Sequence, residues 1–375
     1  MNKDSTIEQV LDFTKTGTGL STFINIGNTC YLNSALQTLM HIDELKKIFL
    51  KTEKLKFENP DFFKDKDMRF YDCIKAIYKG YWEDDCLIRP IGLVRYLDQH
   101  SYFPAGEQSD STEVLTCLIQ KIHEIICVPK DKSEDYATSE LDLLSIKEWN
   151  HHLESKYSQL VNMFWGQYYI KITCDGCGTK SKKFETFHYL TIPAVDEKEE
   201  DPTTPTTLDN LFSHFRTKKF LDDDNKYNCE TCKKKVDRAS TESSVWKLPN
   251  YIVIQLKRYY ERTDGGKKRV MKANRVIDYP ESFDPHTILS PKNKAVYEKD
   301  NLKYSLHSGV FHYGGMMGGH YNCFCWNKDT KEWYRFDDHN KAPIDNPILE
   351  SQSIYQLVYK LEHTVEEDKV KNIDA

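Results

Sequence analysis

Residues 25–39 read NIGNTCYLNSALQTL and carry the strongest local signal in the chain. From residue 32 onwards their apolar side chains recur at helical spacing, which predicts a helix. Asn28 and Thr29 stand just before it and are residue types that favour the N-cap, so Cys30 is expected at or near the first turn. The positive end of the helix dipole favours a thiolate there. The stretch predicts a candidate nucleophile, although a single cysteine is more often a small buried residue.

A nucleophilic thiolate needs a base, and the base needs an orienting group. His320 follows the run GGMMGG (314–319) and begins a predicted strand, and such glycines let a substrate backbone approach closely. The aromatic strand WYRF (333–336) ends in Asp337 and Asp338. If the two strands pair, one carboxylate reaches the imidazole, although aspartates in this position are more often turn residues. Asn25 precedes Cys30 by five residues and is placed to offer its side-chain amide to an oxyanion near the sulfur.

The composition narrows the class of protein. Apolar residues make up 39% of the 375 residues and aromatic residues 13%, which is typical of a globular chain. A net charge of −6 without a basic stripe argues against a nucleic-acid partner. No stretch approaches the roughly 20 apolar residues needed to span a membrane, and the N-terminus lacks a secretory signal. Eleven cysteines, an odd number, are too sparse for a disulfide scaffold, so we expect a reducing compartment, the cytoplasm or the nucleus.

The order of elements favours an α+β fold. A second apolar stripe at helical spacing follows Asp110, and beyond about residue 160 the chain becomes strand-like. The predicted strands are 251–256, 304–313, 321–326, 333–336 and 354–361. We expect a flexible lead at 1–19, a solvated acidic loop at 196–207 and a charged tail at 362–375.

Two C-x-x-C pairs indicate a metal site. They are Cys174 with Cys177 and Cys229 with Cys232. Two such knuckles can close a tetrahedral Cys₄ zinc site even when a long insertion separates them. The insertion of 51 residues is too long for a compact zinc ribbon. A redox role is less favoured because neither pair opens a helix in a βαβ pattern, and a degenerate, empty site is the remaining alternative.

Several of these segments, taken in order, resemble the catalytic domain of ubiquitin-specific proteases. NIGNTCYLNSALQTL resembles the family's cysteine box, and HYGGMMGGHYNCFCW (312–326) with WYRFDD (333–338) resembles its histidine box and acidic follower. EQSDSTEVLTCLI (107–119) and PNYIVIQLKRYY (249–260) resemble two intervening motifs. The resemblance spans residues 20–361 and implies a papain-like cysteine protease fold. Its parts would be a helical thumb (about 20–160), a β-sheet palm (about 160–175 and 250–361) and zinc-clipped β fingers (about 165–250).

Carried over by position, the resemblance implies a complete set of catalytic residues. Cys30 would be the nucleophile, His320 the general base and acid, and Asp337 the orienting residue. Asn25 would help to hold the oxyanion. Asp338 would face away from the imidazole or reach the oxyanion region through water, because side chains alternate along a strand.

The resemblance also implies a channel for the C-terminal tail of ubiquitin, Leu-Arg-Leu-Arg-Gly-Gly. Its expected contacts are Gln108, Asp110, Glu113, Gly318, Gly319 and Tyr321. Two carboxylates among them suit the arginines of the tail. Ser109, Ser111, Thr112 and Val114 depart from the family's motif and leave fine details of this channel open.

The implied function is thiol-dependent hydrolysis of the bond after ubiquitin's C-terminal glycine, with structural zinc as cofactor. The expected partners are ubiquitin, ubiquitinated proteins and an activating or targeting protein. Two alternatives stay open, a weakly catalytic ubiquitin-binding scaffold that needs an activator and a protease for a ubiquitin-like modifier. We further expect residues 259–274 and 314–319 to be mobile loops that close over the tail.

Overall fold

The computed structural model describes residues 17–51, 68–129, 137–154, 156–195, 203–222, 225–264, 267–297, 302–315, 318–347 and 351–362. The chain divides into two compact units. Unit 1 contains the described residues up to Ile126 together with His307–Leu357. Unit 2 contains the described residues of Cys127–Leu306 and those from Val358 onwards.

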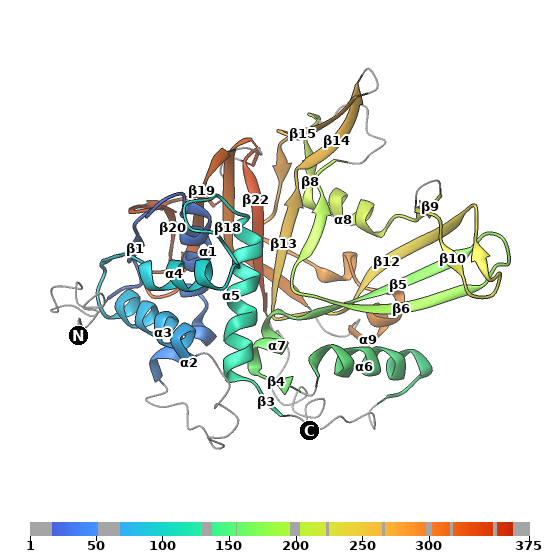
Figure 1. Cartoon of the computed structure of the whole chain (residues 1–375), viewed down its shortest axis with the longest axis horizontal. Coiled ribbons are helices and arrows are strands. Elements are labelled where there is room, and N and C mark those ends of the chain that lie inside the picture. Colours follow the sequence, from blue (N-terminus) through green and yellow to red (C-terminus); the bar gives the residue numbers. More distant parts are fainter. Residues whose placement is uncertain are drawn as a thin grey trace. The chain divides into compact units, whose positions relative to one another are not determined.

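The first half of unit 1 is helical. Its helices are α1 (Cys30–Met40), α2 (Asp43–Lys51), α3 (Met68–Glu83), α4 (Ile91–Gln99) and α5 (Ser111–Ile126). Every residue of α1 is buried, because α1 packs against both α5 and strand β19 (Gly318–Asn327; Figure 1). A helix enclosed on all sides is held in place by its neighbours rather than by its own propensity. The predicted helix at the cysteine is confirmed, and Cys30 is its first residue.

The helix predicted after Asp110 is also confirmed. The Asp110 carboxylate accepts hydrogen bonds from the backbone N–H groups of Thr112 and Glu113, which would otherwise lack partners at the start of α5. The apolar stripe of α5 is buried and consists of Val114, Leu115, Leu118, Ile119, Ile122 and Ile125. Burial of one face therefore fixes the orientation of the helix that follows residues 107–110.

The second half of unit 1 is a sheet with the strand order β21-β20-β19-β18-β22. The strands are β18 (Lys303–Gly315), β19 (Gly318–Asn327), β20 (Glu332–Asp337), β21 (Asn340–Ile344) and β22 (Ile354–Glu362), with β18 and β22 crossing the boundary between the units. Strands β18 and β19 are antiparallel, and Tyr313 pairs with His320. Strands β19 and β20 are antiparallel, and Cys323 pairs with Phe336. The strands predicted in this region are confirmed, and their pairing carries His320 and Asp337 toward the same end of the sheet.

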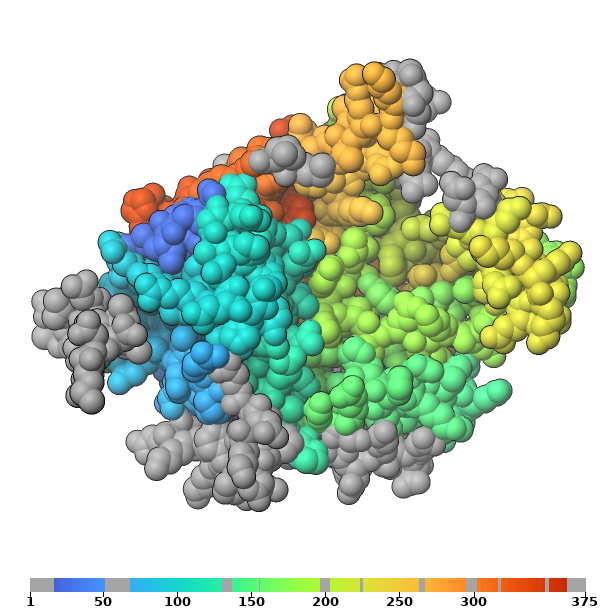
Figure 2. Space-filling model, in the orientation of Figure 1, coloured from blue at the N-terminus to red at the C-terminus, as the bar shows by residue number. Residues whose placement is uncertain are grey.

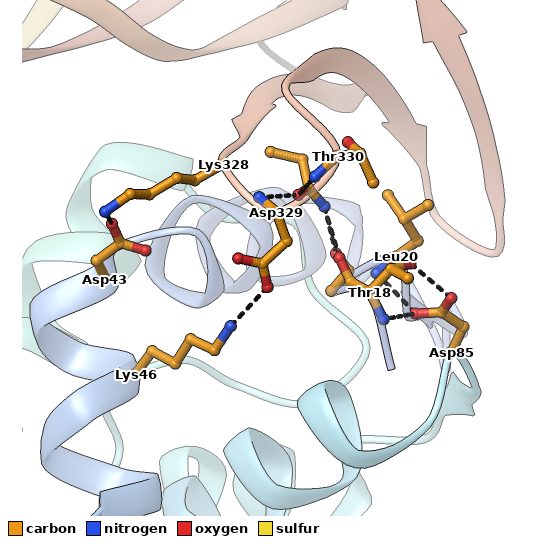
Figure 3. A network of polar contacts seen from close by, with 10 residues as sticks. Thr18, Leu20, Asp43, Lys46, Asp85, Lys328, Asp329 and Thr330 are labelled. Atoms are coloured by element: carbon orange, nitrogen blue, oxygen red, sulfur yellow. Dashed lines mark hydrogen bonds and ion pairs between the residues drawn. The ribbon is translucent and has the colours of Figure 1, made fainter. Parts of the chain in front are cut away.

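A polar network fixes the first described residues onto unit 1 (Figure 3). The Asp85 carboxylate accepts hydrogen bonds from the backbone N–H groups of Thr18 and Leu20 and from the Thr18 hydroxyl, at 2.7–3.0 Å. The turn after β19 is held to α2 by two ion pairs, Lys328 with Asp43 at 2.6 Å and Lys46 with Asp329 at 2.8 Å. Most of the expected N-terminal lead lies outside the described residues, whereas Thr18 is held in place. The short parallel pair β1 (Thr22–Phe23) and β2 (Leu87–Ile88) continues this attachment.

Unit 2 is dominated by strands. Its main sheet has the order β6-β5-β12-β9, formed by β5 (Gly166–Cys174), β6 (Lys180–Phe187), β9 (Lys219–Leu221) and β12 (Ala239–Lys247). The small hairpin β10 (Asn228–Cys229) and β11 (Lys234–Lys235) lies near the end of the long strands (Figure 1). Helix α6 (Glu140–Leu153) packs against β6.

The other elements of unit 2 surround these strands in the sequence. They are β3 (Val128–Pro129), β4 (Lys156–Tyr157), α7 (Gln159–Phe164), β7 (Leu190–Pro193), β8 (Thr206–Thr207), α8 (Leu208–Arg216), β13 (Tyr251–Lys257), β16 (Ile277–Asp278), β17 (Ser282–Phe283), the 3₁₀ turn Pro285–Thr287 and α9 (Pro291–Tyr297). The predicted strand at 251–256 is confirmed as β13, which pairs in parallel with β7. Of the expected loop at 196–207, residues 196–202 lie outside the described residues, and Thr206–Thr207 form a strand that pairs with β16. No described helix is long and apolar enough to cross a membrane.

The prediction of a loop at 259–274 is wrong. Residues Tyr259–Asp264 and Lys267–Lys272 form the antiparallel hairpin β14–β15, which stands out from the surface of unit 2 in Figure 2. Tyrosines at the start of the first strand and Val270 in the second favour extended backbone, and the charged residues between them obscured that signal. Likewise, residues 314–315 and 318–319 end β18 and begin β19, while residues 316–317 lie outside the described residues.

Candidate active site and cysteine cluster

Cys30 is almost fully buried at the N-terminus of α1, with 1% of its surface exposed. Burial raises the pKa of its thiol, the backbone N–H of Tyr321 lowers it, and the negative charge of Asp338 raises it again. The net direction is upward, so the thiol is neutral at neutral pH in this conformation. The sulfur therefore contacts the backbone of the residue that directly follows His320 in the sequence.

His320 and Asp337 form a hydrogen-bonded pair. The Nε2 atom of His320 lies 2.6 Å from Oδ1 of Asp337, and both side chains are about two-fifths exposed. With Nε2 engaged, Nδ1 is the nitrogen left to exchange a proton. Within the described part of the chain, no hydrogen bond joins the Cys30 thiol to the His320 ring. The pair has the arrangement of a base with its orienting carboxylate, not yet engaged with a nucleophile.

The Asp338 side chain lies near His320 and Asp337, contrary to the expectation that it faces away from the imidazole. Its φ of +50° is left-handed, so the chain turns at the end of β20 and the alternation of side chains stops. One ligand atom from each of His320, Asp337 and Asp338 lies within 4.8 Å of the others. Such a group could hold a cation, but the Asp338 oxygens are already engaged by amide groups.

Those amide groups belong to two asparagines in the segment around Cys30. Asn25 Nδ2 donates to Oδ2 of Asp338 at 3.0 Å, and Asn33 Nδ2 donates to Oδ1 at 2.7 Å. The Asn25 side chain is oriented from its other end, because its Oδ1 accepts hydrogen bonds from the backbone N–H groups of Gly27 and Thr29. Asp338 therefore contacts the predicted oxyanion residue directly and needs no bridging water.

Gln108 contacts the backbone beside His320. Its Nε2 donates to the Gly319 carbonyl at 2.5 Å, and its Oε1 accepts from the Gly319 N–H at 2.8 Å. A Cβ atom at Gly319 would lie 2.3 Å from the Tyr313 carbonyl oxygen and 2.4 Å from Nε2 of His312, so the position requires glycine. A Cβ atom at Gly318 would meet nothing within 4 Å. Gln108 and Gly319 thus fix the start of β19, whereas Gly318 is open to a ligand.

The two predicted channel carboxylates differ in their surroundings. Asp110 caps α5 and also accepts a hydrogen bond from the Tyr355 hydroxyl. Glu113 is exposed, and partial burial and then the charge of Asp110 raise its pKa. An arginine would relieve that repulsion. The Tyr321 ring is buried, tilted against His312 and edge-on to Tyr355, with ring centroids 4.5 and 5.9 Å away, so this residue presents its backbone to the site.

Unit 2 brings the four cysteines of the two C-x-x-C pairs together. The sulfur atoms of Cys174 and Cys232 are 3.9 Å apart, those of Cys177 and Cys229 are 3.7 Å apart, and all four lie within 4.8 Å of one another. Zinc bonds of about 2.3 Å to tetrahedral thiolates would separate the sulfurs by about 3.8 Å. The cluster therefore fits a metal ion of that kind.

The backbone around the cluster has the same form in both knuckles. Gly178 and Lys233, the residues directly after the second cysteine of each pair, both have left-handed φ angles of +71° and +55°. Cys174 and Cys229 are buried with Val236 and Ala239 in a small apolar cluster. Two matching turns around four converging sulfurs are expected of a structural site rather than of unrelated cysteines.

Two residues near the active site were not predicted from the sequence. Asn33 lies three residues after Cys30 on α1, and the i, i+3 spacing that puts them on one helix face is visible in the sequence. Tyr355 comes from the segment 354–361, which was predicted only as a strand. Neither has a sequence signal that separates it from an ordinary packing residue.

Comparisons with known proteins identify the family of this chain. The model of the family "Ubiquitin carboxyl-terminal hydrolase" matches residues 21–359. A probable ubiquitin carboxyl-terminal hydrolase of Acanthamoeba polyphaga mimivirus is 24% identical, over 91% of this chain and 90% of its own. Ubiquitin carboxyl-terminal hydrolase 2 of Homo sapiens is 26% identical over 92% of this chain, but the match spans only 56% of the human protein.

A solved structure shares the fold. The SAGA Ubp8/Sgf11/Sus1/Sgf73 DUB module bound to ubiquitin aldehyde contains a chain that superposes with a TM-score of 0.66 at 21% identity, covering 94% of this chain and 72% of the other. The expected papain-like fold of mixed helix and sheet is confirmed. The chain belongs to the ubiquitin carboxyl-terminal hydrolase family of deubiquitinating cysteine peptidases.

Proposed function

We propose that this chain hydrolyses the isopeptide or peptide bond after the C-terminal glycine of ubiquitin, with Cys30 as the nucleophile. The main support for this proposal is that two elements far apart in sequence meet at the Cys30 thiol. Cys30 begins α1, and the backbone N–H beside His320 contacts its sulfur, while His320 is itself bonded to Asp337 at 2.6 Å.

The proposed reaction has two steps. His320 takes the proton of the Cys30 thiol, and the thiolate attacks the glycine carbonyl, so that Asn25 and the backbone N–H of Cys30 hold the oxyanion. The C–N bond breaks as His320 gives its proton to the leaving lysine amine, which leaves a thioester. His320 then removes a proton from water, which attacks the thioester, and the returned proton restores the thiol as ubiquitin leaves.

We infer that Glu113 contributes most to the recognition of the arginine-containing tail. Its carboxylate is exposed, whereas the Asp110 carboxylate is engaged by helix α5 and Tyr355. Gly318 leaves room for the tail backbone. In this proposal Gln108 and Gly319 set the position of the histidine rather than bind the tail.

We also propose that Cys174, Cys177, Cys229 and Cys232 hold one structural zinc ion. The sulfur separations of 3.7 and 3.9 Å support the assignment. The ion would neutralise the thiolates and tie β5, β10 and the loop after each together, without taking part in the reaction. The division of the chain into thumb, palm and fingers remains a prediction.

A resting state that requires a partner is supported by one feature. The Cys30 pKa is raised and the thiol makes no hydrogen bond to His320 among the described residues, so ubiquitin or another protein is expected to bring the two together. The superposed chain comes from a module with Sgf11, Sus1 and Sgf73. We propose by analogy an activating or targeting partner in the cytoplasm or nucleus.

The activity is tested with ubiquitin carrying a fluorogenic C-terminal amide. We expect release of the fluorophore by wild type and no release by the Cys30→Ala variant. Parallel assays with ubiquitin-like modifiers distinguish the alternative substrates. A Cys30→Ala variant as active as wild type would overturn the proposal.

A further inference from the structure

We propose that Asn33 is a positioning residue for the reaction, acting through Asp338 on the oxyanion amide of Asn25. The inference rests on the proposed function. It adds a residue three positions after Cys30 on α1, within the same helix turn.

The contact that carries the inference is a shared carboxylate. Asn33 donates to Oδ1 of Asp338 at 2.7 Å, and Asn25 donates to Oδ2 at 3.0 Å. The Asp338 carbonyl also accepts the backbone N–H of Phe23 at 3.3 Å. One aspartate therefore joins the end of β20 to the segments before and after the nucleophile.

The side chain of Asp338 depends on these hydrogen bonds, because its own backbone does little to orient it. It follows the last residue of β20 and has a left-handed φ of +50°, so the strand does not fix the direction of its side chain. When both carboxylate oxygens are held in place, the hydrogen bond from the Asn25 amide to Asp338 has a fixed direction. Asn25 Nδ2 has two hydrogens, and with one held by Asp338 the other has a defined direction toward an oxyanion.

The surroundings of Asn33 indicate that its amide serves the reaction rather than the stability of the fold. Its side chain is buried, with 3% of its surface exposed. Its Oδ1 atom has no hydrogen-bond partner among the described residues. A buried amide with an unsatisfied oxygen weakens a fold, so an apolar side chain of similar size would serve packing at least as well. The donor to Asp338 is the contribution that only the asparagine makes.

The size of the effect follows from its indirect route. Removal of a direct oxyanion donor lowers turnover by about 10²- to 10³-fold. Asn33 acts through one intermediate residue, so we expect Asn33→Leu to lower kcat by about 10-fold and to change KM by less than about 2-fold. Thr38→Val is the matched control, because Thr38 is equally buried on α1 and, among the described residues, its hydroxyl bonds only to the Ser34 carbonyl. It should keep wild-type kcat.

The test combines three measurements on the full chain with fluorogenic ubiquitin. In an Asn25→Ala background, Asn33→Leu should have almost no further effect, because the amide it positions is gone. Alkylation of Cys30 by iodoacetamide forms no oxyanion, so its rate should be the same in Asn33→Leu and wild type. Melting temperatures identify variants that fail to fold, and Asn33→Ala replaces Asn33→Leu in that case.

Each outcome decides the proposal. Unchanged kcat in a folded Asn33 variant, equal losses with and without Asn25, or a parallel loss of alkylation would overturn it. None of these outcomes bears on the proposed function, which is tested separately by the activity of wild type and of Cys30→Ala.

Discussion

The Nε2 atom of His320 lies 2.6 Å from Oδ1 of Asp337, which leaves the other ring nitrogen to exchange a proton with the thiol. Loss of this hydrogen bond would free the ring to rotate and would weaken it as a base. We therefore expect Asp337→Ala to lower kcat by about 100-fold or more while ubiquitin affinity changes little, because the loss falls on the transition state.

Asp337→Asn should retain more activity than Asp337→Ala, since its amide oxygen can still accept a hydrogen bond from His320. Steady-state kinetics on folded variants, with ubiquitin binding measured separately, check both expectations. Near wild-type kcat in Asp337→Ala, together with a large loss in Asp338→Ala, would move the orienting role to Asp338.

The two adjacent glycines before His320 differ in the space around them. Gly319→Ala would press a methyl group against the Tyr313 carbonyl and His312, and would disturb the bonds to Gln108. We expect it to lower kcat/KM by at least about 10-fold, since displacement of the base disrupts a pre-aligned site. Gly318→Ala adds the same methyl group in open space and is the control for folding, read from melting temperature. Equal activity of Gly319→Ala and wild type would contradict this role of Gly319.

The raised pKa of Cys30 predicts how the free enzyme reacts with iodoacetamide. Burial disfavours the thiolate, so its fraction stays small at pH 7 and grows as pH rises to 9 and beyond. The alkylation rate at Cys30, followed by peptide mapping, should keep increasing over this range. A rate that is already constant between pH 6 and 8 would indicate a preformed thiolate–imidazolium pair and would refute the resting state described above.

The cysteine cluster predicts one tightly bound zinc per chain. Cys229→Ser should remove the metal and lower the free energy of unfolding by about 3 kcal/mol or more, which corresponds to about 4 °C or more in melting temperature for a chain of this length. Cys73→Ser, which lies outside the cluster, should change neither. Elemental analysis measures the zinc content, and thermal denaturation measures the melting temperature. Absence of zinc from protein purified without chelator would refute the zinc site.

The sequence was most informative where local pattern and burial coincide. The helix after Asp110 and the strand at 251–256 were predictable, because each is a long apolar run whose period matches its structure. Cys30 and His320 were predicted as catalytic residues from short motifs, and the structure places their two segments close together. The hairpin β14–β15 was missed, because its many lysines and arginines hide an alternation that only the pairing reveals.

The contacts that position the site were harder to foresee. The role of Asp338 depends on a left-handed backbone angle at the end of β20, which no pattern around an Asp-Asp pair indicates. Asn33 meets Asp338 across 305 residues of sequence. Contacts of this range follow from packing, and a single sequence carries no record of them.

The central claim, that Cys30 is the nucleophile toward ubiquitin, is tested most directly by ubiquitin with an electrophile at its C-terminus. Intact-mass analysis should show one ubiquitin added to wild type, with peptide mapping placing the bond at Cys30, and no addition to a folded Cys30→Ala variant. An adduct that persists in Cys30→Ala, or that maps to another cysteine, would contradict the account.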